Sequence, residues 1–434
     1  MIIVEKDISI ERRRSELLGY RRKNDGESIM GVAEIRTENS SAAVHGADQN
    51  GSVGTVRKQL LASIEPLREI VEGAAKDAEL ERTLPERAWA AMDKANVFSL
   101  KAPRELGGLE ADPMLQMEAF ERMAYFDSSA GWTLMVGAGV QFIAGGWASE
   151  EALELIFDGR KMRRGAVALA PSGKATPVDG GYKLSGRWQF ASGIRHAEWV
   201  VAGAMLQATA EFAPFRAFLL PVGAVTIHDN WHVGGLRGTG SNDFSISEVF
   251  VPREHAWFPF APAVRGGPLF RLGAPEGSAM EHAAFALGVA RRAIDETAEL
   301  AKTKMRGLAP GRTIATREHF QWDLGHEDTR LQAARAHAFR TYEAIWNSVS
   351  AGGSPTVSQS VAARGAAAYA TEVAIDVVHT MFRHAGAKSL YSGNIIERCM
   401  RDVTAAGQHL ICNNLIYQER GKELLDIDEV SPLF

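Results

Sequence analysis

Three polar side chains stand out because their types suit proton transfer and the binding of a polar ligand. Ser192 ends a Trp-Gln-Phe-Ala-Ser run, His196 lies four residues beyond it, and His409 lies near the C-terminus. A serine hydroxyl can hold a hydrogen bond to a bound polar group, and a neutral imidazole near pH 7 can accept a proton. A turn serine or a helical histidine is by itself more often structural, so the assignment depends on the sequence around each. His196 fits a structural and a functional role equally well.

Several cofactor and nucleophile motifs are absent from the sequence. It contains no G-x-G-x-x-G between a strand and a helix, no G-x-x-x-x-G-K-[ST], no H-E-x-x-H, no C-x-x-C and no G-x-S-x-G. The glycine-rich run from Gly234 to Ser241 precedes a strand-like segment, residues 244–251, whereas a dinucleotide cradle needs the N-terminus of a helix. We therefore expect no nicotinamide-binding Rossmann fold in this chain.

Composition and charge exclude further classes of protein. The 434 residues are 46% hydrophobic and 23% charged, which is typical of a globular chain with a sizeable core. Lys and Arg number 48 against 53 Asp and Glu, so no polycationic face for a nucleic acid is expected. The two cysteines, Cys399 and Cys412, are too few for a disulfide framework or a multi-thiolate metal site. With no apolar run of membrane-spanning length, we expect a cytoplasmic protein with neither a metal site nor a membrane contact.

The first 54 residues differ in amino-acid composition from the rest of the chain. They are polar, rich in Ser, Asn, Glu and Arg, and they end in a Gly-Ser stretch. Such a segment offers little apolar surface to offset the conformational entropy lost on folding. We therefore expect a disordered arm over residues 1–54, and a fold that begins at Thr55, where apolar residues start to recur at helical spacing.

Helical signals continue over the next hundred residues. Thr83-Leu84-Pro85-Glu86 fits a capping box. Asp112 before Pro113 fits an N-cap followed by a proline in the first turn. Residues 128–147 are small and apolar enough for a helix that is buried on most sides. An N-terminal helical domain is thus predicted over residues 55–160.

Short strand-like segments follow, and then a second helical region. The segments are residues 165–169, 182–190, 199–206, 215–220, 223–228 and 244–251. Asp179-Gly180-Gly181 predicts a hairpin turn, and the absence of helical patterns between the segments favours an antiparallel barrel or sandwich over residues 161–265. Helical periodicity then returns, with a long apolar stripe from Val373 to Ala385, and predicts a helical bundle over residues 266–434.

Four segments, in their order along the chain, carry a resemblance to a known family: Pro103 to Gly108, Gly186 to Trp199, Gly235 to Ser241 and Arg398 to His409. They resemble the acyl-CoA dehydrogenase fold and, more narrowly, its flavin-dependent monooxygenase branch, the oxygenase components of two-component aromatic hydroxylases. The resemblance covers nearly all of the chain from Thr55 onward. It implies a mainly α protein with a central β domain: an N-terminal helical domain, a middle antiparallel β-barrel and a C-terminal four-helix bundle.

The resemblance also implies a cofactor and its contacts. Reduced FMN or FAD (FMNH2 or FADH2) would lie between the barrel and the bundle and react with O2. A hydroxyl at the place of Ser192 bonds the N5 side of the flavin in this family, and a fixed polar partner in a dry cavity would prolong a C4a-hydroperoxide. The implied cofactor contacts are Ser192, Phe190, Gly193, Arg237, Thr239 and Ser241, and the implied substrate pocket holds Trp132, Gln141 and His196.

His409 stands where the dehydrogenases carry the glutamate that removes a substrate α-proton, and their Tyr-Glu-Gly signature is not seen here. The resemblance therefore implies that His409 accepts a substrate proton. Some phenol-hydroxylating relatives also place a histidine on the buried helix that faces the substrate. Residues 136–143 contain none, and Gln141 is the one side chain there able to form a hydrogen bond. This difference puts a simple phenolate in doubt and leaves polycyclic, indole-like and sulfur-containing substrates open.

The predicted activity is the insertion of one oxygen atom from O2 into a small apolar aromatic substrate. The missing nicotinamide fold implies a separate NAD(P)H:flavin reductase, and the resemblance implies a homotetramer that packs through the bundle. Two alternatives stay open: an acyl-CoA dehydrogenase-type flavoprotein that oxidises an acyl thioester, and a non-catalytic flavoprotein.

Overall fold

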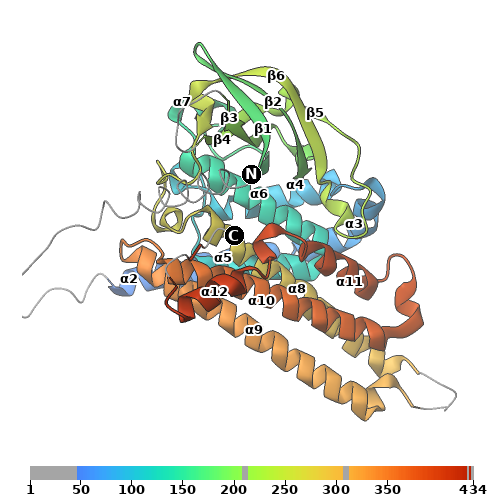
Figure 1. Cartoon of the computed structure of the whole chain (residues 1–434). Coiled ribbons are helices and arrows are strands. Elements are labelled where there is room, and N and C mark those ends of the chain that lie inside the picture. The colour runs from blue at the N-terminus through green and yellow to red at the C-terminus, as the bar shows by residue number, and fades with distance from the viewer. Residues whose placement is uncertain (1–45, 208–213, 306–311, 428–429, 432–434) are drawn as a thin grey trace, which may run out of the picture. The chain divides into compact units, whose positions relative to one another are not determined.

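The structure is a computed structural model that describes residues 46–207, 214–305, 312–427 and 430–431, with side chains from Thr55 onward. The chain divides into two units, residues 1–54 and 55–434, and the second contains the fold described below. Figure 1 shows helices, then a sheet, then long helices along the chain, so the predicted fold class is confirmed. Residues 1–45 of the predicted arm lie outside the described residues. Residues 46–54 begin helix α2 (Gly46–Ile64), since extending an existing helix costs far less than starting one.

The described N-terminal region contains five α-helices after α2, and local sequence signals predicted where one of them begins. They are α3 (Leu67–Glu81), α4 (Glu86–Lys94), α5 (Pro113–Phe126), α6 (Ser128–Trp147) and α7 (Glu150–Ile156). The Asp112 carboxylate accepts a hydrogen bond from Leu115 N at 3.0 Å, which confirms the predicted N-cap. The capping box predicted at Thr83 is wrong, because the backbone at Pro85 is extended and α4 begins after it. Thr83 Oγ1 instead lies 3.3 Å from His196 Nε2.

Seven strands form one sheet in the order β5-β6-β2-β1-β3-β4-β7. They are β1 (Gly165–Val178), β2 (Gly181–Ala191), β3 (Trp199–Leu206), β4 (Phe215–Pro221), β5 (Thr226–Ile227), β6 (Asn242–Pro252) and β7 (Ala256–Trp257). The predicted hairpin turn joins β1 to β2. The sheet departs from an antiparallel arrangement at one pair, because β1 and β3 are parallel. The chain turns back along β2 and then crosses to the opposite edge of β1, so β3 runs in the direction of β1.

The C-terminal helices pack through long apolar faces. They are α8 (Ala274–Thr303), α9 (Glu318–Ser350), α10 (Val357–Ala385), α11 (Ile395–Ala406) and α12 (Ile416–Leu424). Helix α10 contacts α8, α9, α11 and α12. In the predicted stripe on α10, from Val373 to Ala385, most of the apolar residues are buried, and Phe382 is half-buried. No helix of the described residues is long and apolar enough to cross a bilayer.

The predicted domain boundaries, at residues 54, 160 and 265, stay predictions. The last two fall between elements, since α7 ends at Ile156, β1 begins at Gly165, β7 ends at Trp257 and α8 begins at Ala274.

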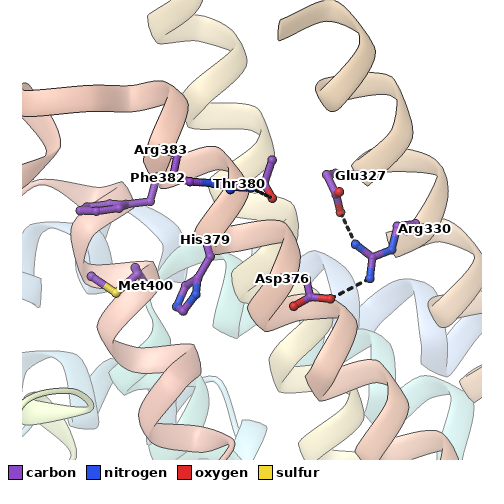
Figure 2. Close-up of a pocket in the computed structure, with 8 residues that line it drawn as sticks. All are labelled: Glu327, Arg330, Asp376, His379, Thr380, Phe382, Arg383 and Met400. Carbon is purple, nitrogen blue, oxygen red and sulfur yellow. Dashed lines mark hydrogen bonds and ion pairs between the residues drawn. The ribbon is translucent and has the colours of Figure 1, made fainter. Parts of the chain in front are cut away.

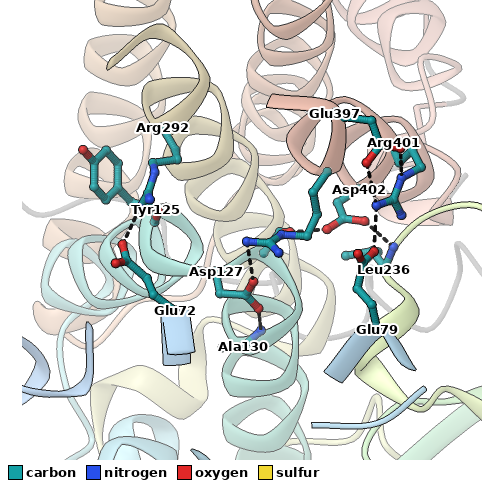
Figure 3. Close-up of polar contacts among 12 residues, drawn as sticks. Glu72, Glu79, Tyr125, Asp127, Ala130, Leu236, Arg292, Glu397, Arg401 and Asp402 are labelled. Carbon is teal, nitrogen blue, oxygen red and sulfur yellow. Dashed lines mark hydrogen bonds and ion pairs between the residues drawn. The ribbon is translucent and has the colours of Figure 1, made fainter. Parts of the chain in front are cut away.

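Charged side chains join α11 to the N-terminal helices and to the loop before β6 (Figure 3). Asp402 is 1% exposed, and its carboxylate accepts hydrogen bonds from Ser128 Oγ and from Leu236 N. Arg401 pairs with Glu79 of α3 at 2.7 Å. Arg398 pairs with Asp127 at 3.5 Å. These contacts fix the loop at residues 235–241 against the N-terminus of α6.

Candidate active site

A chain of buried hydroxyl groups links the end of β2 to the start of β6. Ser192 Oγ lies 2.7 Å from Ser241 Oγ, which lies 2.7 Å from Thr239 Oγ1. Ser192, Ser241 and Thr239 are 6%, 3% and 1% exposed. The Thr239 hydroxyl also donates to the Leu236 carbonyl oxygen at 2.8 Å. The structure therefore brings together three of the predicted cofactor contacts.

The direction of each bond in this hydroxyl chain follows from its two ends. A carbonyl oxygen can only accept, so the single hydroxyl hydrogen of Thr239 is committed to Leu236. Ser241 must then donate to Thr239, and Ser192 must donate to Ser241. The indole Nε1 of Trp132 can only donate, and it donates to Ser192 Oγ at 3.2 Å. Ser192 thus keeps one lone pair for a further donor and has no hydrogen left to offer.

The backbone around Ser192 has an unusual shape. Phe190 has a φ of 62° and Gly193 a φ of 73°, both in the left-handed region. Glycine is suited to position 193 for a second reason, because an added Cβ would lie 3.2 Å from the Trp89 ring. Gly193 N donates to the Thr239 carbonyl oxygen at 2.9 Å, which ties the two loops together. The Phe190 side chain is 66% exposed beside these buried hydroxyls, where a planar ligand could cover it.

Trp132 connects the hydroxyl chain to a cluster of rings from the C-terminal helices. Its indole lies edge-on to Phe285 and His282 of α8, with ring centroids 5.2 and 5.4 Å away, and to His409 at 5.9 Å. The His282 and His409 rings lie 4.3 Å apart. Ser192 and His409 therefore both contact the indole of Trp132.

His282 is a residue that the sequence reasoning missed. It is 4% exposed and lies in a segment of α8, residues 279–290, that is apolar apart from His282 and Glu281. Its place beside Glu281, as a polar pair in this apolar run, was the signal in the sequence. Burial, the nearby His409 and the Lys101 charge hold the pKa of His282 well below its usual value, against the hydrogen bond to Ser278. His282 is therefore neutral near pH 7.

His409 lies at the open side of the ring cluster. Its Nδ1 accepts a hydrogen bond from Ile411 N at 3.2 Å and so caps the short turn that follows. In the neutral ring the hydrogen is then on Nε2. Desolvation of the ring lowers the pKa of His409 to about 4, so the ring is neutral near pH 7.

Two predicted pocket residues lie elsewhere. Gln141 is nine residues beyond Trp132 on α6, and at 3.6 residues per turn this spacing places it on the opposite face. Gly137 and Gly145, four residues to either side of Gln141, face Phe98 and Pro103. The place of Gln141 in the substrate pocket stays a prediction, and it would have to contact the substrate from the face of α6 opposite Trp132.

His196 anchors the loop after β2 instead. Its ring stacks on Trp89 at 4.6 Å, and its Nε2 lies 2.7 Å from the Leu84 carbonyl oxygen. Its Nδ1 lies 3.1 Å from Glu86 Oε2. These contacts account for both ring nitrogens and favour the structural role.

Arg237 lies two residues before Thr239 of the hydroxyl chain, and its side chain bonds the backbone of the same loop. It lies in the short turn Arg237–Thr239, and its Nε donates to the Val233 carbonyl oxygen at 2.9 Å. The guanidinium is half-buried at the edge of the loop. A cation in this position could meet a phosphate group.

A buried ion pair lies next to His282. Lys101 is fully buried and pairs with Glu281, and its Nζ also donates to the Gly277 carbonyl oxygen at 3.1 Å. Burial raises the pKa of Glu281 to about 7, while Lys101 opposes this rise. Replacing either partner would leave an uncompensated buried group.

Other polar groups lie on the bundle, away from these residues. His319, Asp323 and His384 have donor atoms within 4.8 Å of one another and are the group, among the described residues, that could hold a metal ion. His384 Nε2 lies 2.6 Å from Asp323 Oδ2, so this pair is already satisfied by a hydrogen bond. Figure 2 shows a second polar pocket, in which Arg330 pairs with Glu327 and with Asp376. None of the predicted site residues lines it.

Comparison with known proteins agrees with this geometry. The N-terminal domain of acyl-CoA dehydrogenases matches residues 55–152, and their C-terminal domain matches residues 280–414. An indole-3-acetate monooxygenase of Pseudomonas putida is 28% identical over 331 residues, which are 75% of this chain and 83% of that protein. The flavin-dependent monooxygenase oxygenase subunit HsaA of Mycobacterium tuberculosis is 35% identical over 196 residues, 45% of this chain and 50% of that protein.

A solved structure resembles the fold over most of its length. XiaF from a Streptomyces species, in complex with FADH2 and glycerol, superposes with a TM-score of 0.82 at 24% identity, and covers 89% of this chain and 99% of its own. At this identity the likeness concerns the fold. Because the two matched domains flank the sheet and together span more than half of the sequence, this chain belongs to the acyl-CoA dehydrogenase family.

Proposed function

We propose that this chain is the oxygenase component of a two-component flavin-dependent monooxygenase that hydroxylates an aromatic substrate. The observation that carries the proposal is the hydroxyl chain that ends at Ser192, joined through Trp132 to His409 and His282. The relatives named above are monooxygenases, and family membership supplies the flavin fold.

The residues around Ser192 fit a reduced flavin. Reduced flavin carries a hydrogen on N5, whereas oxidised flavin has a lone pair there. The free lone pair of Ser192 can accept from an N5–H group, and its committed hydrogen cannot serve an oxidised N5. Phe190 would lie against the ring and Arg237 near the phosphate. When bound, reduced flavin supplies the electrons and, with O2, the oxygen atom that enters the substrate.

The residues on the other side of Trp132 would hold the substrate. Trp132 and Phe285 are 7% and 1% exposed and offer aromatic faces, so they favour an apolar ring and exclude water. The Nε2–H group of His409 would donate a hydrogen bond to an acceptor atom of the substrate. These contacts suit a small aromatic molecule better than a charged one.

The reaction needs partners that the chain does not supply. Its sequence has no dinucleotide motif, so electrons come from a separate NAD(P)H:flavin reductase. Large apolar side chains on the C-terminal helices are exposed, among them Trp322 at 63%, Tyr391 at 75% and Leu410 at 63%. These residues, rather than the buried α10 stripe, support self-association into a tetramer.

The acyl-CoA dehydrogenase reaction is the second candidate, because the family match itself favours it. It needs a carboxylate base at the substrate, and His409 stands in that place in the sequence. The purified chain should therefore be given reduced flavin, O2 and a panel of aromatics that includes indole-3-acetate and resorcinol. A parallel panel of acyl-CoA thioesters with a dye acceptor is the comparison. Hydroxylated product in the first panel supports the proposal, and dye reduction in the second without hydroxylated product overturns it.

A further inference from the structure

We propose that the proton acceptor of this site is Nε2 of His282, and that His409 acts as a hydrogen-bond donor. The inference rests on the proposed function and assigns the roles of the two rings within it. It exchanges the role expected of His409 from the sequence for a residue on a different helix.

The tautomer of His282 follows from its backbone partner. Nδ1 lies 2.8 Å from the carbonyl oxygen of Ser278, one turn earlier on α8. A carbonyl oxygen cannot donate, so Nδ1 carries the hydrogen and Nε2 carries the lone pair. This Nε2 is buried and has no hydrogen-bond partner in the part of the chain that the structure describes. An unsatisfied acceptor in an apolar helix face is costly, and a bound donor would remove that cost.

The tautomer of His409 is the opposite one. The Ile411 backbone N–H cannot accept, so Nδ1 of His409 carries a lone pair and Nε2 carries the hydrogen. To accept a substrate proton at Nε2, His409 would first have to lose that hydrogen or give up the cap at Ile411. With ring centroids 4.3 Å apart, the two rings place one acceptor and one donor side by side.

This pair matches a hydroxyl group on an aromatic ring. The substrate O–H donates to His282 Nε2, and the substrate oxygen accepts from His409 Nε2–H. As electron density leaves the ring toward the oxygen atom that reduced flavin and O2 supply, the O–H bond breaks, its electron pair stays on the substrate oxygen, and the proton goes to His282 Nε2. Some phenol-hydroxylating relatives carry a histidine on the helix that corresponds to α6, where this chain has none. His282 of α8 takes over its role, so phenols are included among the proposed substrates.

Burial and the charged groups around His282 keep its ring neutral, so Nε2 holds a lone pair and takes a proton only once the substrate O–H has become strongly acidic. The His409 ring lies 4.3 Å from that of His282, and Glu281 of the Lys101–Glu281 pair is the preceding residue on α8. Lys101 opposes a second positive charge on His282, so the ring stays neutral until the substrate releases a proton.

The tautomers can be observed without flavin or substrate. Nitrogen NMR of the full chain with 15N-labelled histidine, assigned with the two variants below, should give His282 as the Nδ1–H form and His409 as the Nε2–H form at pH 7. Finding the hydrogen of His282 on Nε2 would overturn the proposal whether or not the chain is a monooxygenase.

Two substitutions then separate the roles in turnover. His282→Asn keeps an amide N–H for Ser278 but removes the Nε2 acceptor, so hydroxylation of a phenol should fall about a hundredfold to ten-thousandfold. His409→Gln keeps an N–H near Nε2 and should stay within about tenfold of the unaltered chain. His379→Gln is the control, because His379 bonds Thr404 and lines the pocket of Figure 2, which contains none of the ring-cluster residues. The reverse ranking of His282→Asn and His409→Gln would overturn the proposal.

The phenol and its O-methyl ether, given to the unaltered chain, test the substrate class. Hydroxylation of the phenol alone supports the donor–acceptor match, and equal rates with both count against it. If neither these nor other aromatics are hydroxylated, the proposed function fails, and the NMR result still decides the tautomers.

Discussion

The hydroxyl chain predicts that the site discriminates between the two redox states of flavin, and Ser241→Ala tests this most directly. Ser241 links Thr239 to Ser192 through two hydrogen bonds of 2.7 Å. Removing its hydroxyl frees the Ser192 hydrogen, which can then rotate toward a ligand. An oxidised flavin, which the unaltered chain should bind more weakly than reduced flavin, would then find a hydrogen-bond donor for its N5 atom.

The size of the effect follows from one hydrogen bond at a buried site. Ser192 is 6% exposed, so an unmet bond there costs about 1 to 3 kcal/mol. At 1.4 kcal/mol per factor of ten, the unaltered chain should bind reduced flavin about tenfold to hundredfold more tightly than oxidised flavin. In Ser241→Ala this ratio should approach one. Thr239→Val removes only the bond that fixes the direction, so it should lower the ratio to an intermediate value.

The assay is equilibrium binding of FMN and FAD, oxidised in air and reduced under anaerobic conditions, followed by flavin fluorescence or ultrafiltration. Ser245→Ala is a matched control, because Ser245 lies on the same strand β6 and bonds His228 instead. Thermal unfolding of each variant checks that the fold is intact. A ratio unchanged in Ser241→Ala, with the fold preserved, would refute the reasoning about bond direction.

Four further predictions follow from single contacts. His409→Asn keeps a side-chain acceptor for Ile411 but loses the Nε2–H donor, so product per flavin consumed should fall about tenfold and released hydrogen peroxide should rise; an unchanged yield would exclude His409 from the site. Burial raises the pKa of Asp402 to about 6, so its contribution to folding is present below about pH 4 and is lost as pH rises through 6. Between pH 4 and 7.5 the unaltered chain should therefore lose up to about 3 kcal/mol of unfolding free energy relative to Asp402→Asn, as measured by urea unfolding. Unfolding free energies of the two proteins that change in parallel with pH would contradict the burial of a charge. Lys101→Met should destabilise the chain by about 3 to 5 kcal/mol, and adding Glu281→Gln should recover most of this; a double variant no better than the single one would count against the ion pair. Light scattering at micromolar concentration should report an oligomer that Trp322→Glu weakens, and a monomeric unaltered chain would contradict self-association.

Patterns of local periodicity determined much of the fold in advance. The helix at residues 128–147, the N-cap at Asp112 and the turn at residues 179–180 all depend on neighbours in sequence, and each is present in the structure. The order of helical, strand and helical regions was likewise visible, because each has its own hydrophobic period. The capping box at Thr83 failed because Pro85 disfavours a helical backbone at Leu84, so α4 begins only at Glu86, and because His196, far along the chain, contacts the threonine hydroxyl.

Contacts across the fold decided the rest of the candidate site. The sequence by itself indicated Ser192 and His409, together with the loop that carries Thr239 and Ser241. It could not place His282 beside His409, since 127 residues separate them and only the packing of α8 against the C-terminal segment brings their rings to 4.3 Å. Nor could it show what each face of α6 contacts, because a helix buried on nearly all sides has no polar face that orients it.

The roles of the two histidines depend on the backbone next to each ring and on the packing that brings the rings together. Residue type fixes what an imidazole can do, and that much was readable from the sequence. Which nitrogen carries the hydrogen depends on whether the backbone nearby offers a carbonyl oxygen, as Ser278 does, or an N–H group, as Ile411 does. Both partners are local, since Ser278 lies one turn before His282 on α8 and Ile411 lies two residues after His409. The packing of α8 against the C-terminal segment decides instead that the two rings meet and that Nε2 of His282 is buried without a partner among the described residues.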